Sequence, residues 1–348
     1  MKKYLYAITV ALLSVGSYTF LGDDVTEFLQ DNFSKESSDV STAGFIQDSG
    51  SIQVYFCPGD QCNSALVDFL DSAQESIHCA MFEIDLPDVR QKLLEKANGL
   101  NGTRQVEVQI VTDNDYLYEF NHSFVKTDSY GLMHNKFCIV DGKKISTGSM
   151  NPTVNCAFKN NNNILLIESE LLARNYEDEF EEMWNGTFKK GSRVEHPSII
   201  LNQTEINIYF CPEDDCAEKV KEELEKVQKT IHFMTFSFTN EKIANVLLMK
   251  NLENISVSGV MEARQVSKYS VFNQLKQNGI AVFKDKNPAN MHHKVFIIDS
   301  EVVITGSFNP TSGGDNKNDE NVLIIKDKEI AQLFEEEFEK VYGEANAE

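Results

Sequence analysis

Apolar and polar positions recur along this chain in two patterns, one typical of strands and one typical of helices. Short runs rich in β-branched and aromatic residues predict strands at 52–56 and 206–210. Apolar residues at three- and four-residue spacing predict amphipathic helices at 63–74 and 217–228. Further strands are expected at 106–112, 136–141, 145–147 and 164–167, and acidic helices at 170–184 and 328–342. This alternation predicts an α/β fold with mixed sheets.

The pattern occurs twice, which identifies the chain as a tandem repeat of one long unit. Ile52 begins Ile-Gln-Val-Tyr-Phe-Cys-Pro and Ile206 begins Ile-Asn-Ile-Tyr-Phe-Cys-Pro, an offset of 154 residues. We expect two α/β sandwich units with mixed sheets, related by a pseudo-twofold, that share one active site at their interface. The expected boundaries are 52–184 for the first unit, 185–205 for a linker and 206–345 for the second unit.

The N-terminus has the pattern of an export segment. Lys2 and Lys3 precede an apolar run over 4–22, which ends at Asp23-Asp24. Its length is close to that of a membrane-spanning helix, so 1–22 is either a cleaved signal peptide or an N-terminal membrane anchor. Residues 23–51 are polar and predict a flexible spacer. Both alternatives place the protein outside the cytoplasm, secreted or membrane-anchored.

Cysteine spacing agrees with export. Two Cys-x4-Cys pairs occupy equivalent positions of the halves and are candidate disulfides: Cys57 with Cys62, and Cys211 with Cys216. Zinc binding is a weaker alternative because no histidines lie nearby, and free thiols are a third. Cys79 and Cys138 lie in apolar runs, where we expect buried thiols.

The net charge argues against both nucleic acid and anionic lipid surfaces as long-range partners and does not distinguish between them. Acidic residues number 54 and basic residues 32, a formal net charge of −22. Such a field keeps a protein soluble and repels both polyanions and anionic lipid surfaces at long range.

Each half contains the pattern His-x-Lys-x4-Asp-x6-Gly-Ser-x-Asn. The two copies comprise His134, Lys136, Asp141, Ser149 and Asn151, and His292, Lys294, Asp299, Ser307 and Asn309. Residues two apart on a strand share a face, so each histidine and lysine are expected side by side, and the serine and asparagine return beside them on the next strand.

This set suits attack on a phosphodiester. A neutral imidazole is a competent nucleophile and an imidazolium can protonate the leaving oxygen, while lysine, serine and asparagine side chains bind the phosphoryl oxygens without a metal or another cofactor. Since each half supplies one histidine, a single site requires both halves. His292-His293 might suggest a metal ligand pair, but neighbours on a strand point to opposite faces and no partner cluster is evident.

The doubled motif resembles the signature of the phospholipase D superfamily over roughly residues 50–345. That resemblance implies catalysis by His134 and His292, phosphate binding by Lys136, Lys294, Asn151 and Asn309 with support from Ser149 and Ser307, and stabilisation of the motif's turn by Asp141 and Asp299. It further implies phospholipases, phosphatidyltransferases and nonspecific endonucleases as relatives.

The halves differ in one informative position. Glu320 lies 28 residues after His292, whereas the equivalent position of the first half is Asn162. A carboxylate orients an imidazole and stabilises its cation, while an amide only orients it. The resemblance implies that an acidic residue after Gly-Ser-x-Asn orients a histidine, so we hypothesise that Glu320 reaches across the interface to His134. The same resemblance favours His134 as the nucleophile and His292 as the acid and base, and the sequence leaves the reverse assignment as the alternative.

The expected function is a metal-independent phosphodiesterase that acts through a covalent phosphohistidine, with phospholipid slightly favoured as substrate. A secreted endonuclease for DNA or RNA is the close alternative, with Lys143-Lys144, Lys284 and Lys286 as candidate strand contacts. A phosphatidyltransferase and an inactive phosphate-binding relative are the others. The substrate is the expected partner, a membrane is a candidate partner of the N-terminal segment, and both half-sites in one chain favour a monomer.

Overall fold

The computed structural model describes residues 46–347, and the predicted export segment and most of the predicted spacer lie outside them. Residues from Ile46 onward form one compact unit. No helix in this part of the chain combines the length and the apolar character needed to span a bilayer.

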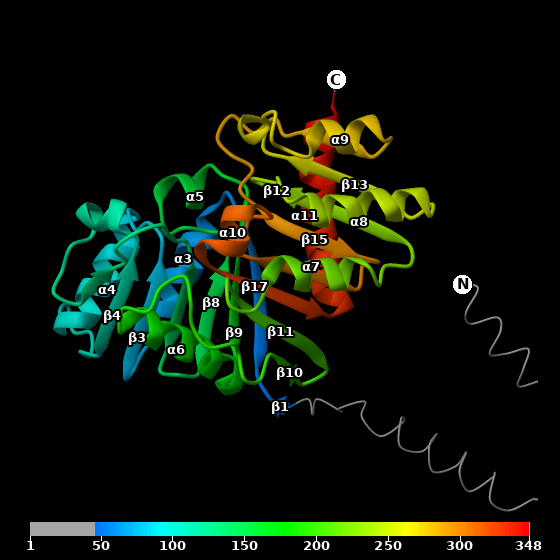
Figure 1. The fold of residues 1–348 in the computed structure, drawn as a ribbon. Coiled ribbons are helices and arrows are strands. Elements are labelled where there is room, and N and C mark those ends of the chain that lie inside the picture. Colours follow the sequence, from blue (N-terminus) through cyan, green and yellow to red (C-terminus); the bar gives the residue numbers. More distant parts are fainter. Residues whose placement is uncertain (1–45, 348) are drawn as a thin grey trace, which may run out of the picture. The chain divides into compact units, whose positions relative to one another are not determined.

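The first half is built on a seven-stranded sheet of order β2-β9-β8-β7-β3-β4-β5 (Figure 1). Its strands are β2 (Ser51–Cys57), β3 (Ser76–Met81), β4 (Glu107–Thr112), β5 (Val125–Thr127), β7 (Lys136–Val140), β8 (Lys144–Gly148) and β9 (Asn162–Glu168). The pairs β3–β4 and β4–β5 are parallel and the others antiparallel, so the predicted mixed sheet is confirmed.

The second half repeats this connectivity as β11-β17-β16-β15-β12-β13-β14 and adds β10 and β1 at one edge. Its strands are β1 (Ile46–Asp48), β10 (Ser198–Leu201), β11 (Thr204–Cys211), β12 (Thr230–Thr235), β13 (Ser256–Met261), β14 (Ala281–Lys284), β15 (Lys294–Ile298), β16 (Val302–Gly306) and β17 (Asn318–Lys326). A short strand of the first half, β6 (Leu132–Met133), also pairs with β17.

Helices cover both sheets. Those of the first half are α3 (Asp60–Asp71), α4 (Pro87–Asn98), α5 (Val154–Phe158) and α6 (Glu170–Trp184), with the 3-10 turn η1 (Asn114–Glu119). Those of the second half are α7 (Cys216–Leu224), α8 (Glu241–Leu252), α9 (Phe272–Gln277), α10 (Ser312–Asn316) and α11 (Lys328–Asn346), with η2 (Ala263–Gln265). Helix α6 begins at Ser169, whose hydroxyl accepts the Leu172 N–H and caps the first turn.

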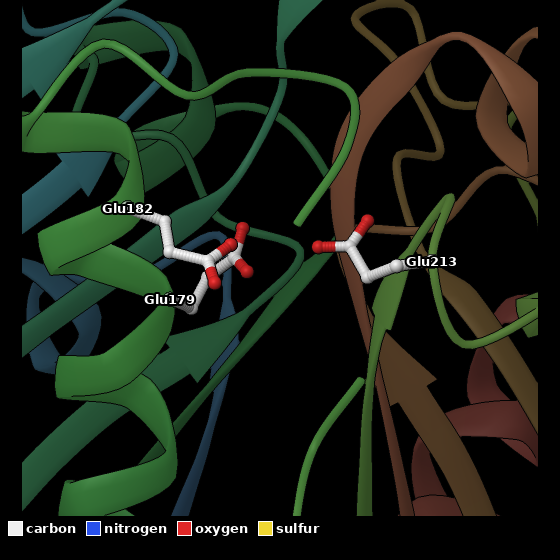
Figure 2. A group of neighbouring side chains, drawn as sticks. All are labelled: Glu179, Glu182 and Glu213. Atoms are coloured by element: carbon white, nitrogen blue, oxygen red, sulfur yellow. The ribbon is translucent and has the colours of Figure 1, made fainter. Parts of the chain in front are cut away.

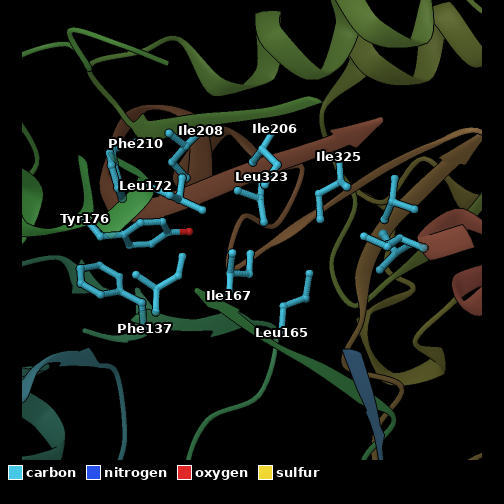
Figure 3. Packing of buried hydrophobic residues seen from close by; sticks show 14 of the residues in the cluster. Phe137, Leu165, Ile167, Leu172, Tyr176, Ile206, Ile208, Phe210, Leu323 and Ile325 are labelled. Atoms are coloured by element: carbon cyan, nitrogen blue, oxygen red, sulfur yellow. The ribbon is translucent and has the colours of Figure 1, made fainter. Parts of the chain in front are cut away.

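The two halves share their largest hydrophobic core. Residues from the first sheet and α6, such as Phe137, Leu165 and Tyr176, pack in one cluster with Phe210 and Leu323 of the second sheet (Figure 3). Smaller cores lie between each sheet and its outer helices. Because buried aromatic and aliphatic side chains contribute most of the stability of a core, the halves are expected to fold as one body.

Short strands occur within both segments that the sequence analysis described as a spacer and a linker. Residues 46–48, within the predicted spacer, form β1, which pairs in parallel with β10 inside the predicted linker. Both segments are short, and each became a strand by pairing at the edge of the second sheet, whose position depends on residues far along the chain.

The disulfide predictions were right for two pairs and wrong for a third. Cys57–Cys62 and Cys211–Cys216 are bonded as expected. Cys79 and Cys138, expected as thiols, also form a disulfide, because β3 and β7 place them directly opposite with Cα atoms 4.0 Å apart. The second half has Phe233 opposite Phe296 at the equivalent positions. Among the described cysteines, Cys156 is free and buried.

The Cys79–Cys138 bond is expected to stabilise the fold more than either short pair. It joins residues 59 apart, while the others join residues 5 apart. Loop-closure entropy then gives about 4 kcal/mol for the long loop and about 2 kcal/mol for a short one. We expect Cys79→Ala/Cys138→Ala to lower the free energy of unfolding in urea by that larger amount. Cys211→Ala/Cys216→Ala is the matched control, and equal losses would contradict the expectation.

Candidate active site at the interface of the two halves

Each motif histidine is held by the backbone of the opposite half. His134 follows β6, and its N–H donates to the Asp319 carbonyl of β17 at 2.9 Å. The His292 N–H donates to the Asn161 carbonyl at 2.8 Å. Both histidines therefore precede β7 and β15 rather than lying within them, which corrects the expected placement in a strand. This exchange brings the two motifs into one site.

Each motif lysine is buried beneath its histidine. Lys136 Nζ donates to the His134 carbonyl at 2.5 Å, and Lys294 Nζ to the His292 carbonyl at 2.7 Å. The ammonium groups also lie 5.1 and 5.0 Å from the ring centroids of Phe82 and Phe236. Only 2% of Lys136 and 3% of Lys294 are exposed, so most of their hydration has been lost and an anion would bind strongly.

The two imidazoles are oriented by different groups from the opposite half. Glu320 Oε2 lies 2.7 Å from His134 Nδ1, which is the cross-interface contact that the sequence predicts. Asn162 Oδ1 lies 2.8 Å from His292 Nδ1. An acceptor on Nδ1 fixes the proton there and leaves Nε2 of each ring for chemistry. The rings are thus similarly oriented, one by a carboxyl group and the other by an amide.

The serines support these orienting groups. Ser149 Oγ donates to Asn162 Oδ1 at 3.2 Å and accepts the Asn163 N–H at 3.0 Å. Ser307 accepts the Asn321 N–H at 2.9 Å and also hydrogen bonds to Glu320. The glycines before them adopt φ angles of 135° and 132°, and an added Cβ would meet the carbonyl oxygens of Asn163 and Asn321. Both features explain Gly-Ser at these positions.

Asn151 and Asn309 have unsatisfied polar atoms directed at the site. Both line the central cavity, and the Oδ1 of each is buried without a hydrogen-bond partner in the described structure. Because amide oxygen and nitrogen are interchangeable by a flip, either atom can face a ligand. Buried polar groups without partners are uncommon, and after such a flip the amide N–H groups would donate to the oxygens of a phosphoryl anion.

A second polar layer behind the histidines was missed by the sequence analysis. Asn321 Nδ2 donates to Asn135 Oδ1 at 2.8 Å, and Asn163 Nδ2 lies 3.2 Å from His293 Nδ1. His293 thus points away from the cavity that His292 lines, as predicted for neighbouring residues. The repeated asparagine after Asn162 and after Glu320 was the available signal.

A cavity of about 600 Å³ lies over the paired motifs. It is lined by Phe82, Glu83, Tyr116, Leu132, His134, Asn151, Thr153, Asn155, Cys156, Asn160, Phe236, Ser237, Gln265, Asn290, His292, Asn309, Thr311, Gly313 and Asn318. None of these lining residues is a lysine or an arginine, since Lys136 and Lys294 lie beneath the histidines.

Burial and mutual repulsion disfavour the charged forms of the basic groups in this cluster. Burial, and then the two motif lysines, lower the pKa of His134 and of His292 well below the ordinary value. Burial lowers the pKa of Lys136 to about 8 and that of Lys294 well below its usual range. Burial raises the pKa of Glu320 to about 7. An incoming phosphodiester anion would favour the protonated forms of all four basic groups.

The motif aspartates lie away from the cavity and bind backbone. Asp141 accepts the N–H groups of Gln74, Glu75 and Ser76, at the start of β3, at 2.7 to 3.0 Å. Asp299 accepts the equivalent N–H groups of residues 228–230. Both have positive φ, 55°, at the hairpin turn after the motif strand. The predicted turn position is therefore observed, and each aspartate also joins that turn to a neighbouring strand.

A cluster of three glutamates outside the cavity is close enough together to be a candidate metal site. Oxygen atoms of Glu179, Glu182 and Glu213 lie within 4.8 Å of one another, and the three side chains converge from α6 and the segment after β11 (Figure 2). Burial, then the Glu213 charge, raises the pKa of Glu179 well above its ordinary value, and burial raises that of Glu213 to about 7. None of the three lines the active-site cavity, so they take no part in its chemistry.

Comparisons with known proteins agree with this site. The profile of the family described as "Cardiolipin synthase, PLD-like domain" matches residues 66–184 and 220–342, one match in each half. Phospholipase D of Rickettsia conorii is 30% identical over 144 residues, covering 41% of this chain and 72% of that protein. Mitochondrial cardiolipin hydrolase of Homo sapiens is 35% identical over 112 residues, covering 32% of this chain and 44% of that protein.

A solved structure shows the same fold across both halves. Phosphatidylserine synthase of Haemophilus influenzae superposes with a TM-score of 0.64 at 12% identity, covering 83% of this chain and 86% of that one. Together with the two profile matches, this establishes the expected tandem α/β architecture. The chain belongs to the phospholipase D superfamily, a superfamily of phosphodiesterases.

Asp141 is expected to stabilise the fold in its ionised form. Partial burial would raise its pKa, but the N–H donors of Ser76, Glu75 and Gln74 outweigh burial and lower that pKa below 3.8. Asp141→Asn should therefore lower the free energy of unfolding at pH 7 by about 1–3 kcal/mol. Because a depressed pKa stabilises above the unfolded value, the difference from wild type should shrink as pH falls through 3.8.

Urea unfolding across this pH range measures the effect. Asp68→Asn on the exposed face of α3 is the control and should leave stability nearly unchanged. A loss for Asp141→Asn that persists unchanged below the pKa of Asp141 would show that the carboxylate charge is not its source.

Proposed function

We propose that the protein hydrolyses phosphodiesters without a metal, through a covalent phosphohistidine on His134, and that phospholipids are its substrates. The observation that carries the reaction is the pair of imidazoles, oriented from opposite halves, on one cavity with two buried ammonium groups beneath them.

In the first step, Nε2 of His134 attacks phosphorus and the bond from phosphorus to the leaving oxygen breaks. Protonated His292 gives its Nε2 proton to that oxygen, so an alcohol departs and His292 becomes neutral. The bound phosphate anion supplies the charge that allows His292 to be protonated despite its lowered pKa. Lys136 and Lys294 neutralise the charge on the phosphoryl oxygens.

In the second step, His292 removes a proton from water as the water oxygen attacks phosphorus. The phosphorus–nitrogen bond breaks, the phosphomonoester leaves, and His292 is protonated again for the next cycle. The asymmetry of the orienting groups supports this assignment: the Glu320 carboxylate stabilises a phosphoimidazolium on His134, while neutral Asn162 lets His292 release its proton easily.

Phospholipid is favoured over nucleic acid by the surroundings of the cavity. Leu132 lines the cavity and is 37% exposed, and the exposed side chains of Tyr118, Tyr130 and Phe158 belong to segments next to lining residues. Apolar and tyrosine side chains together suit a lipid–water interface. The lysines considered as strand contacts do not line the cavity, and Lys143-Lys144 lie at the far end of the β7–β8 hairpin.

We further propose that the protein is exported and acts as a monomer. The three disulfides favour an oxidising compartment, and the N-terminal apolar run is the expected export segment. Because one chain supplies both motifs, the active site needs no second copy.

Substrate assays in excess EDTA test the reaction and its substrate. We expect turnover of bis-p-nitrophenyl phosphate and of phosphatidylcholine vesicles to be unchanged by EDTA, because lysines neutralise the phosphate charge. Single-stranded DNA and RNA should be cleaved far more slowly. Loss of all activity in EDTA would overturn metal independence, preferential cleavage of DNA or RNA would establish the nuclease alternative, and added alcohol yielding a new phosphodiester would reveal transfer.

The covalent intermediate is expected on His134. In His292→Ala, an activated nitrophenyl ester still loses its leaving group but water is not activated, so phosphohistidine should accumulate. Acid-labile label located by mass spectrometry on His134 is the expected result. His134→Ala is the matched control and should trap none, whereas label on His292 in that variant would reverse the assignment.

A further inference from the structure

The repeat allows the two ends of the cavity to be compared residue by residue. Phe82 and Phe236 occupy equivalent positions, because their N–H groups donate to the carbonyl oxygens of Asn135 and His293, the residues after the motif histidines. The next residue is Glu83 in the first half and Ser237 in the second. Both line the cavity.

A second pair of equivalent lining residues, Tyr116 and Gln265, also differs between the halves. Asp113 and Glu262 are equivalent, since their carboxylates accept the N–H groups of Met133 and Met291. Three residues later the first half has Tyr116 and the second has Gln265, and both line the cavity. Besides the phenylalanine common to both ends, the first-half end therefore has an acidic and an aromatic residue where the second-half end has two neutral polar residues.

The Glu83 carboxylate has no partner of its own. It forms no hydrogen bond or ion pair with any residue of the described structure, and Lys136 is the cation whose charge acts on it. Glu119 and Asp85 add negative charge nearby, although Arg90 lies 3.6 Å from Glu119 and offsets part of it. An unpaired carboxylate in a cavity favours a cationic ligand.

Aromatic rings connect this carboxylate with the reacting centre. The Phe82 ring centroid lies 5.0 Å from that of His134 and 4.8 Å from that of Tyr116. Aromatic faces next to a carboxylate bind ammonium and trimethylammonium groups through cation–π attraction and ion pairing. A cation here would lie beside the phosphate held by the motif lysines.

We propose that Glu83, with the rings of Phe82 and Tyr116, binds the cationic group of a phosphodiester whose alcohol carries an ammonium or trimethylammonium group, such as an ethanolamine or choline ester. This assignment rests on the proposed function and narrows its substrate class. It also predicts that a nucleic-acid strand is a poor substrate, because the strand's neighbouring phosphates would meet Glu83 instead of a cation.

The selectivity should depend on pH. Burial, and then the charges of Glu119 and Asp85, raise the pKa of Glu83 to about 7, while Lys136 opposes the shift. Because the carboxylate form binds the cation, preference for a cationic substrate should grow as pH rises through 7.

Two soluble p-nitrophenyl esters that differ only in charge test the proposal: the choline ester and its uncharged isostere, the 3,3-dimethylbutyl ester. For the full chain at pH 8 we expect kcat/KM to favour the choline ester roughly tenfold. Glu83→Gln should remove most of that preference and its pH dependence. Glu83→Ser/Tyr116→Gln, which copies the second-half lining, should abolish the preference.

Asp85→Asn is the matched control, because Asp85 carries similar charge and accepts the Val154 N–H without lining the cavity. It should keep the wild-type preference at pH 8. Equal kcat/KM for the two esters in wild type, or equal losses for both in Glu83→Gln, would overturn the proposal. Wild-type turnover of bis-p-nitrophenyl phosphate separates this outcome from failure of the proposed function, which would abolish turnover of every ester.

Discussion

The site depends on one constraint: each half holds the motif histidine of the other half in place. The Asp319 carbonyl fixes the backbone of His134 and the Asn161 carbonyl fixes that of His292, while Glu320 and Asn162 orient the rings across the same interface. These contacts exist only when the sheets pack on their shared core. Folding and assembly of the site are therefore one event, and a half alone would leave its histidine without the group that selects its tautomer.

The same packing creates the electrostatic character of the site. Two lysines and two histidines are buried together in a chain whose net charge is −22, so their charged forms are disfavoured by desolvation and by one another. A single phosphodiester anion would offset both the desolvation and the mutual repulsion of these groups. It would pair with the ammonium groups and raise the proton affinity of the imidazoles. Attraction is thus confined to the cavity, while the acidic surface opposes polyanions elsewhere.

Much of the site could be predicted because its residues lie close together in the sequence and the same motif occurs in both halves. The spacing of His134, Lys136 and Asn151 recurs at offset 158. The difference between the halves, together with the family resemblance, predicted Glu320 as the partner of His134. Features that depend on register or on distant edges could not be predicted. The bond between Cys79 and Cys138 requires knowing that β3 and β7 align them, and β1 becomes a strand only because β10 offers a free edge. Similarly, the asparagine layer behind the histidines looks like an ordinary polar loop until both halves are in place.

Differences between equivalent positions of the two halves make the histidines and the two ends of the cavity unequal, although the fold repeats. A carboxylate faces one histidine and an amide the other, and an acidic aromatic lining at one end of the cavity faces a neutral one at the other. Two identical halves would give two equal nucleophiles and no preferred orientation for a substrate with unlike ester arms. In the proposed mechanism, Glu320 distinguishes the histidines because only His134 has a carboxylate beside it. In the proposed substrate selection, Glu83 distinguishes the ends of the cavity because only the first-half end has a carboxylate at that position. Both differences between the halves place a carboxyl group in a desolvated cavity, where a single charge has its largest effect.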